Sequence, residues 1–258
     1  MIINPTLHII VASGYNISVI AGVVLMVLAG LLNRKIAIIL SGFVILLYVL
    51  LVGAEPAIVR AGIMAGVALI AGFLGREADG LRVLVFTAGL MLLSQPVLLW
   101  DIGFQLSFLA TLGLILLVPR LDFLDHLIKP VGLVKDIKET TAAQLMVFPV
   151  LLFNFQSFSW LGFLVNPLVL WLVPLIMALG LVQITLGWFW PLAKIVAGLN
   201  YVVLHSMVVI IKLAAGFGGG EWRIFGLPAS FIFVYYGIIC LWVFKTRIKS
   251  SRRQNKLK

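Results

Sequence analysis

Long apolar stretches, separated by short polar segments, occupy most of the chain between residues 15 and 245. A helix needs about 20 mostly apolar residues to cross the hydrocarbon core of a bilayer. The pattern therefore predicts an all-α polytopic membrane protein with about nine transmembrane helices, some of them broken. These stretches lie near residues 15–32, 36–53, 57–75, 81–99, 103–118, 141–155, 160–187, 192–215 and 228–245.

The segment 119–141 has a different pattern, in which apolar residues recur at roughly helical spacing and charged residues take the other face. It predicts an amphipathic helix that lies along the inner membrane surface. Thr141 and Gln144, three residues apart, predict a capping box that opens the next span. The apolar positions are Leu121, Leu124, Ile128 and Val131, and the charged ones are Asp122, Asp125, Lys129 and Lys135.

Composition supports the membrane assignment: of 258 residues, 63% are hydrophobic and 11% are charged, and the net charge is +10. Many basic residues lie near the carboxyl terminus, so we place that end in the cytoplasm. Nine crossings then put every basic residue inside except Arg60, Lys212 and Arg223. We expect one membrane domain over residues 1–245 and a basic cytoplasmic tail over 246–258.

Polar residues within or beside the spans need an explanation, because a charged side chain near the bilayer centre costs about 2.5 to 3.5 kcal/mol. Arg60 enters the third span, and Asp101 stands where the fifth begins. In the predicted topology both helices start at the outer face, so these two charges can pair; the alternative is that Arg60 extends to the membrane interface. The candidate residues for a buried polar core or translocation pathway are His8, Ser13, Asn16, Arg60, Asp101, Gln105, Ser107 and Asn166.

Small residues four apart predict close helix packing at three places. The three seams are Gly14–Ser18–Gly22, Gly62–Gly66 and Gly103–Ser107–Thr111. Prolines also interrupt the later spans, and each removes one backbone donor and frees a carbonyl. These prolines are Pro149, Pro167 and Pro174, with Asn154, Gln156 and Asn166 as the nearby polar partners that we expect for the freed carbonyls.

The sequence has no phosphate-binding loop, no paired zinc histidines and no cysteine–histidine cluster with metal spacing. Its three histidines, His8, His126 and His205, are far apart in sequence. No two carboxylates fall within one predicted span, as acid–base chemistry in the membrane would require. We therefore expect no enzymatic activity, no metal site and no cofactor.

The polar and proline-bearing clusters, in this order, resemble the membrane competence domain of the ComEC family, the inner-membrane DNA-uptake channel of transformable bacteria. The most specific match is the run Asp-x-Gly-Phe-Gln-Leu-Ser-Phe within SQPVLLWDIGFQLSFLATLG, residues 94–113. Asn16 replaces a histidine that is common in the family. Weaker matches are HIIVASGYN, the segment from Pro56 to Arg60-Ala61, QLMVFPVLLFNF and FSWLGFLVNPLVLWLVP.

The resemblance implies that the domain lies in the cytoplasmic membrane of a bacterium and helps to carry single-stranded DNA across it, with a separate cytoplasmic ATPase as the energy source. Many family members also carry an external oligonucleotide-binding domain and a nuclease-like domain, which this sequence does not contain, so the expected partners include such external domains. Two alternatives stay open: a transporter for a smaller polar or anionic solute, and a membrane scaffold that transports nothing.

Overall fold

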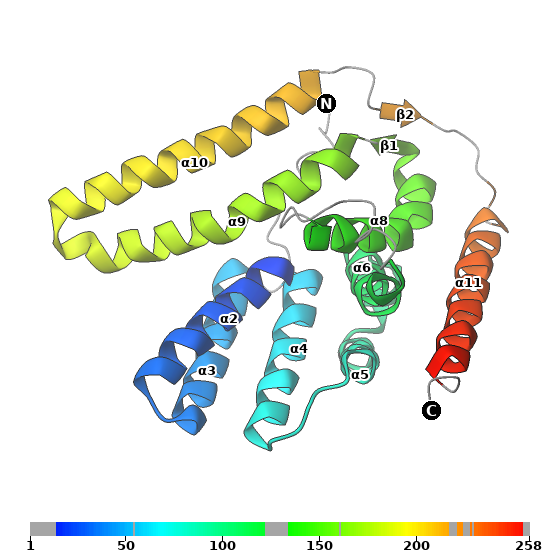
Figure 1. The fold of residues 1–258 in the computed structure, drawn as a ribbon, viewed down its shortest axis with the longest axis horizontal. Helices are drawn as coiled ribbons and strands as arrows, with labels where there is room; N and C mark the ends of the chain where they lie inside the picture. The colour runs from blue at the N-terminus through cyan, green and yellow to red at the C-terminus, as the bar shows by residue number, and fades with distance from the viewer. Residues whose placement is uncertain are drawn as a thin grey trace. The chain divides into compact units, whose positions relative to one another are not determined.

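A computed structural model of the chain describes residues 14–53, 55–121, 134–159, 161–216, 221–223, 228 and 230–254. Almost all of these residues are helical (Figure 1). The α-helices are α2 (Gly14–Leu31), α3 (Arg34–Val52), α4 (Pro56–Phe73), α5 (Gly80–Ser94), α6 (Ile102–Leu117), α8 (Val134–Phe155), α9 (Leu161–Thr185), α10 (Trp190–Gly216) and α11 (Ser230–Gln254). Three short 3₁₀ helices are η1 (Pro96–Trp100), η2 (Val118–Arg120) and η3 (Leu186–Trp188).

The helices confirm the predicted fold class, an all-α membrane protein. Among the described residues, five helical segments are long and apolar enough to cross a membrane: Arg34–Val52, Pro56–Phe73, Ile102–Arg120, Trp171–Trp188 and Trp190–Ala214. Three shorter apolar helices are Ile20–Leu31, Gly80–Ser94 and Ser230–Thr246. The number of nine crossings and the domain boundary at residue 245 stay predictions. The helix α11 runs past residue 245 and ends at Gln254.

Two predicted helix bounds are wrong. The fourth span was expected to reach residue 99, but α5 ends at Ser94, since Pro96 disfavours the helical conformation at Gln95, which is extended (φ −145°). The sixth was expected to begin at Thr141, but α8 begins at Val134 and runs through Thr141. Lys135 and Glu139 form an ion pair one turn apart that supports the added turns. The Thr141–Gln144 capping box is therefore wrong, and residues 122–133 of the predicted surface helix lie outside the described residues.

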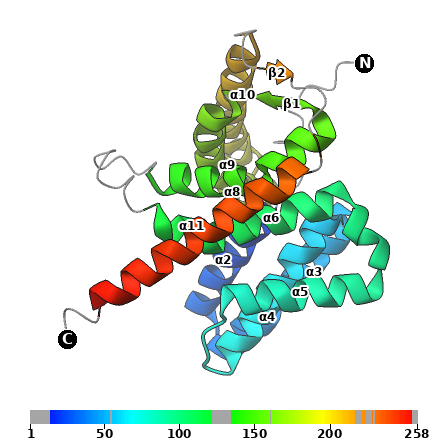
Figure 2. The same ribbon diagram turned by 90° about the vertical axis from the view of Figure 1, so that its right-hand side faces the viewer.

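The chain divides into two compact units, and the first comprises Met1–Phe108 and Leu164–Phe217. Within it, α2, α3 and α4 lie side by side as a three-helix bundle (Figure 1 and Figure 2). Their core contains Ile17 from α2, Ile45 from α3, and Ile58 and Ala61 from α4. This core fixes α4, the helix that carries Arg60.

Only part of the predicted glycine packing is present. A β-carbon added at Gly62 would lie 2.8 Å from the Cγ2 of Val49, so α3 and α4 approach closely there. Added at Gly66 or Gly22, it would meet nothing within 4 Å, so neither of these glycines packs against another helix in the part of the chain that the structure describes. Spacing identified the small residues but not the face of the helix that meets a neighbour.

The second unit comprises Leu109–Phe163 and Gly218–Lys258. Its core gathers Leu117, Leu121, Ala142 and Met146, and residues of α11 pack against this cluster. Gly113 of α6 faces α8 so closely that an added β-carbon would lie 2.5 Å from the carbonyl oxygen of Ala142. This glycine, which lies outside the three predicted seams, marks a close approach of α6 to α8.

Two short strands in the second unit pair antiparallel: β1 (Ser157–Ser159) and β2 (Glu221–Arg223), with Phe158 opposite Trp222. They belong to two loops separated by more than 60 residues. The predicted topology puts both loops on the outer side, and strands that pair must share a side of the membrane. The pairing therefore agrees with that topology, while the side itself stays a prediction.

Candidate functional site

Of the predicted pathway residues whose side chains the structure describes, Arg60 alone is buried. It stands one turn into α4, which begins at Pro56, a residue whose fixed φ suits the first position of a helix. Its exposed fraction is 8%, although it is charged. A charge buried in an apolar helix is costly unless polar partners surround it.

The side chain of Arg60 contacts both its own helix and α6. Its Nε donates to the Oγ of Ser107 at 2.6 Å, and its Nη1 lies 3.5 Å from the sulfur of Met64. The guanidinium also lies 5.9 Å from the centre of the Phe108 ring, a distance at which a cation is attracted to the ring face. The ring of Phe104 lies 4.3 Å from that of Phe108. We call Arg60, Met64, Phe104, Ser107 and Phe108 the Arg60 group.

Asp101 does not pair with Arg60, so the predicted ion pair is wrong. Its Oδ1 accepts the backbone N–H of Phe104 at 2.6 Å, at the start of α6, and the residue is exposed. The first N–H groups of a helix have no partner within the helix, and an aspartate that precedes the helix satisfies one of them. The carboxylate is therefore used to cap α6, while Ser107, nearly two turns further along, reaches Arg60.

Gln105 also has a local partner. Its Nε2 donates at 2.8 Å to the carbonyl oxygen of Leu99, which lies in the preceding 3₁₀ helix η1. Asp101 and Gln105 together hold the junction between η1 and α6, and Ser107 and Phe108 follow immediately. The polar side chains of Asp101 and Gln105 thus fix the start of α6, the helix whose Ser107 contacts Arg60.

A second polar arrangement, in the other unit, surrounds the proline of α8. Pro149 is buried inside the helix and has no N–H to give to the carbonyl of Leu145. The hydroxyl of Tyr235 donates to that carbonyl at 2.9 Å, and the hydroxyl of Tyr236 donates to the carbonyl of Met146 at 2.7 Å. Two neighbouring tyrosines of α11 thus bind the broken turn of α8.

The polar partners expected for that break were different. Asn154 donates instead to the carbonyl of Val150 in its own helix. Gln156 has a φ of +52° and leaves the helix at its end. The tyrosines were missed because they lie about 90 residues away in sequence, and the only available signal was a pair of polar rings inside an apolar span.

The other predicted pathway residues are placed less fully. His8 and Ser13 lie outside the described residues. Asn16 belongs to α2 and Asn166 to α9, and their side chains also lie outside what the structure describes. The structure therefore brings Arg60 of α4 and Ser107 of α6 together. Asp101 and Gln105 lie at the start of α6.

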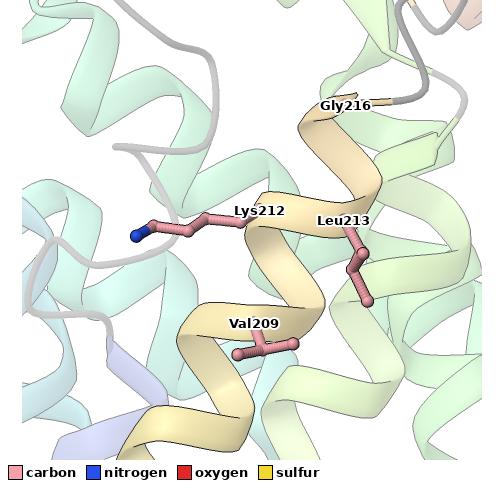
Figure 3. Close-up of a pocket in the computed structure, with 4 residues that line it drawn as sticks. All are labelled: Val209, Lys212, Leu213 and Gly216. Carbon is pink, nitrogen blue, oxygen red and sulfur yellow. The ribbon is translucent and has the colours of Figure 1, made fainter.

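A separate pocket of about 440 Å³ opens beside α10 (Figure 3). Its described lining residues are Val209, Lys212, Leu213 and Gly216, and the side chains of Lys212 and Leu213 project from different sides of the helix. Among these described residues, one amine stands against an apolar lining, and none of the others is an acid, a base or a nucleophile that could act with it. None of these residues is a predicted pathway residue.

Comparison with known proteins decides the family. A family model described as Competence protein matches residues 5–248. The chain belongs to the competence protein family. The matched range includes Arg60 and Ser107, together with every other residue predicted for the pathway. The resemblance inferred from the sequence is thereby confirmed.

One curated relative of this competence-family chain is the ComE operon protein 3 of Bacillus subtilis (strain 168). The two are 31% identical over 163 residues, which make up 62% of this chain and 20% of the relative. The chain thus matches about a fifth of the length of that protein. No solved structure matches it.

Proposed function

We propose that this competence-family chain forms a membrane passage through which a single DNA strand crosses the cytoplasmic membrane of a bacterium. The observation that carries the proposal is the family match over residues 5–248. The partners we propose are a cytoplasmic ATPase that supplies energy and external domains that bind or cut DNA. We assign no enzymatic step to this chain.

The Arg60 group has the chemistry that such a passage needs. A polyanion crossing a membrane is favoured by buried cations and hydrogen-bond donors, and arginine binds phosphate oxygens well. Aromatic rings can also stack with unpaired bases without regard to sequence. Arg60 and Ser107 supply the polar atoms, and Phe104 and Phe108 supply two adjacent rings. In this proposal, Arg60 contacts the phosphate backbone as the strand passes.

Reconstituted vesicles test the proposal directly. Protein in liposomes is given a fluorescent single-stranded oligonucleotide, with an inside-positive potential to draw the anion inward, and external nuclease then destroys whatever stays outside. We expect protected label that depends on the protein and falls as salt rises, because phosphate contacts are screened and compete with counterions. Absence of protein-dependent protection would contradict the proposal.

Variants connect passage to the Arg60 group. We expect Arg60→Gln to reduce passage about tenfold, which corresponds to about 1.4 kcal/mol, and Arg60→Lys to retain most of it because the charge stays. Arg82→Gln is the matched control, since Arg82 is an exposed arginine paired with Asp79. Vesicles that admit a small inorganic anion but exclude the oligonucleotide would favour a solute transporter instead, and vesicles that admit neither would favour a scaffold.

A further inference from the structure

An open apolar groove runs between α3 and α4 in the first unit, in a place that the proposed passage does not use. Its volume is about 370 Å³, within the range of about 300 to 1,000 Å³ that small-molecule sites occupy. Gly42 of α3 and Gly66 of α4 both line it. A β-carbon at Gly66 would meet nothing within 4 Å, and one at Gly42 would meet only Leu69, at 3.9 Å. The missing side chains of these two glycines leave the groove open.

The groove is apolar along its length. Ile39 from α3 and Ile70 from α4 line it with more than 60% of each side chain exposed. Phe73 and Leu74 line it where α4 ends. A lining of this kind has no hydrogen-bond donors for a polar solute but suits a hydrocarbon chain.

One end of the groove carries cations. The first residues of α3 lie beside the last residues of α4 in space, because the Nη2 of Arg34 donates to the carbonyl oxygen of Gly72 at 3.4 Å. The Nζ of Lys35 lies 5.8 Å from the centre of the Phe73 ring, so its ammonium stands directly beside the lining. Arg76 follows two residues after Leu74. Both Arg34 and Lys35 are exposed, so an anion can approach them.

Acidic residues neutralise these cations only in part. Asp79 is occupied, because it caps α5 and pairs with Arg82 at 3.7 Å. Glu77 stands next to Arg76 in sequence. The side chain of Asn33 makes no capping bond to the first N–H groups of α3. The positive end of the helix dipole therefore adds to the charges of Arg34 and Lys35. The result is a positive end joined to an apolar groove.

We propose that this groove binds an anionic phospholipid, with an acyl chain over Gly42 and Gly66 and the phosphate at Arg34 and Lys35. Basic pockets between membrane helices bind anionic headgroups in this way. The positive-inside topology places Arg34 and Lys35 at the cytoplasmic face. The site is independent of the proposed passage of DNA, because it requires neither Arg60 nor a nucleic acid.

Native mass spectrometry of the whole chain tests the site. Protein extracted from membranes that contain equal amounts of phosphatidylglycerol and phosphatidylethanolamine should retain the anionic lipid preferentially. Arg34→Gln/Lys35→Gln should reduce this preference by roughly thirtyfold, as expected for two headgroup contacts. Arg82→Gln, which neutralises an arginine outside the groove, should leave it unchanged. Equal retention of both lipids by the wild-type chain, or an unchanged preference in the double variant, would overturn the proposal.

A groove-filling variant separates the apolar half of the site from the charged half. Gly66→Phe should lower retention of every lipid at the site while Arg34 and Lys35 are still present. Gly22→Phe is the matched control, because Gly22 is also helical and open but lies in α2, outside the groove. Size-exclusion profiles show whether each variant is folded. If folded Gly66→Phe protein keeps the anionic lipid, the phospholipid does not occupy this groove.

Discussion

The hydroxyl groups of Tyr235 and Tyr236 show how a single buried residue, Pro149, can be accommodated inside a helix. The carbonyl that the proline leaves without its helical donor accepts a hydrogen bond from another helix instead. A helix break in an apolar setting is stable only when such carbonyls are satisfied. The two tyrosines therefore anchor α11 to α8.

We expect Tyr236→Phe to destabilise the protein by about 0.6 to 1.7 kcal/mol, because the phenyl ring keeps its packing but can no longer donate to the carbonyl of Met146. The measurement is the midpoint of thermal aggregation in detergent. Tyr201→Phe is the control, since Tyr201 is 67% exposed on α10. Equal midpoints for the wild-type protein and Tyr236→Phe would show that this hydrogen bond contributes nothing.

Glu139 lies in the charged first turns of α8, before the apolar part of that helix, and gives the stability a dependence on pH. Burial raises the pKa of its carboxyl above the ordinary value of 4.5; Lys135 opposes this effect and Asp136 adds to it. The folded state thus holds the proton more tightly than the unfolded state. The stabilisation is complete below pH 4.5 and is lost as the pH rises through the raised pKa.

The test compares the thermal midpoint of the wild-type protein with that of Glu139→Gln, which stays neutral at every pH. We expect the wild-type midpoint to fall relative to the variant as the pH rises from below 4.5 to neutrality. A relative rise would mean that attraction to Lys135, 3.8 Å away, outweighs burial.

The sequence identified Arg60 as a candidate for a buried polar core, but its partner could not be predicted. In the predicted topology α4 and α6 start at the same depth, and the hydrogen bond between Arg60 and Ser107 agrees with that expectation. The choice between Asp101 and Ser107 depended on where α6 begins. Because Asp101 stands before the first helical residue, it caps the helix, and hydropathy alone does not locate a cap to one residue.

At the scale of elements, helix packing depends on which glycine faces a neighbour. Gly62, Gly66 and Gly113 all stand inside apolar stretches of the sequence. Of these three, only Gly62 and Gly113 pack against other helices in the structure. Local spacing shows which small residues share one side of a helix, but contacts between distant segments decide which of these residues meets a neighbouring helix. The same limit explains why the additional turns of α8 were missed: their charged residues looked like a surface segment.

We expect Gly113→Ala to cost about 1 to 3 kcal/mol, because the methyl group would overlap the carbonyl oxygen of Ala142 and force α6 and α8 apart. Thermal midpoints in detergent measure the effect. Gly89→Ala is the matched control: the same change in α5 meets nothing within 4 Å and should be neutral or slightly stabilising. A midpoint unchanged by Gly113→Ala would contradict the close approach of the two helices.

At the scale of the whole molecule, hydropathy was sufficient for the fold class, and the family match agrees with it. The antiparallel pairing of β1 with β2 adds a constraint that hydropathy cannot supply, because two loops far apart in sequence must emerge on one side. At this scale the proposed function depends on one physical requirement. The polar atoms around Arg60 must be reachable by a DNA strand while they are shielded from lipid.

Photocrosslinking to a stalled strand tests that requirement most directly. A photoreactive phenylalanine analogue replaces Met64, which contacts Arg60, or Leu93, which is 85% exposed on α5. A single-stranded oligonucleotide with a bulky protein at its trailing end is then drawn into the reconstituted protein and illuminated. We predict DNA crosslinks from position 64 and none from position 93. Passage of DNA without a crosslink from position 64, or with equal crosslinks from both positions, would contradict the role of the Arg60 group.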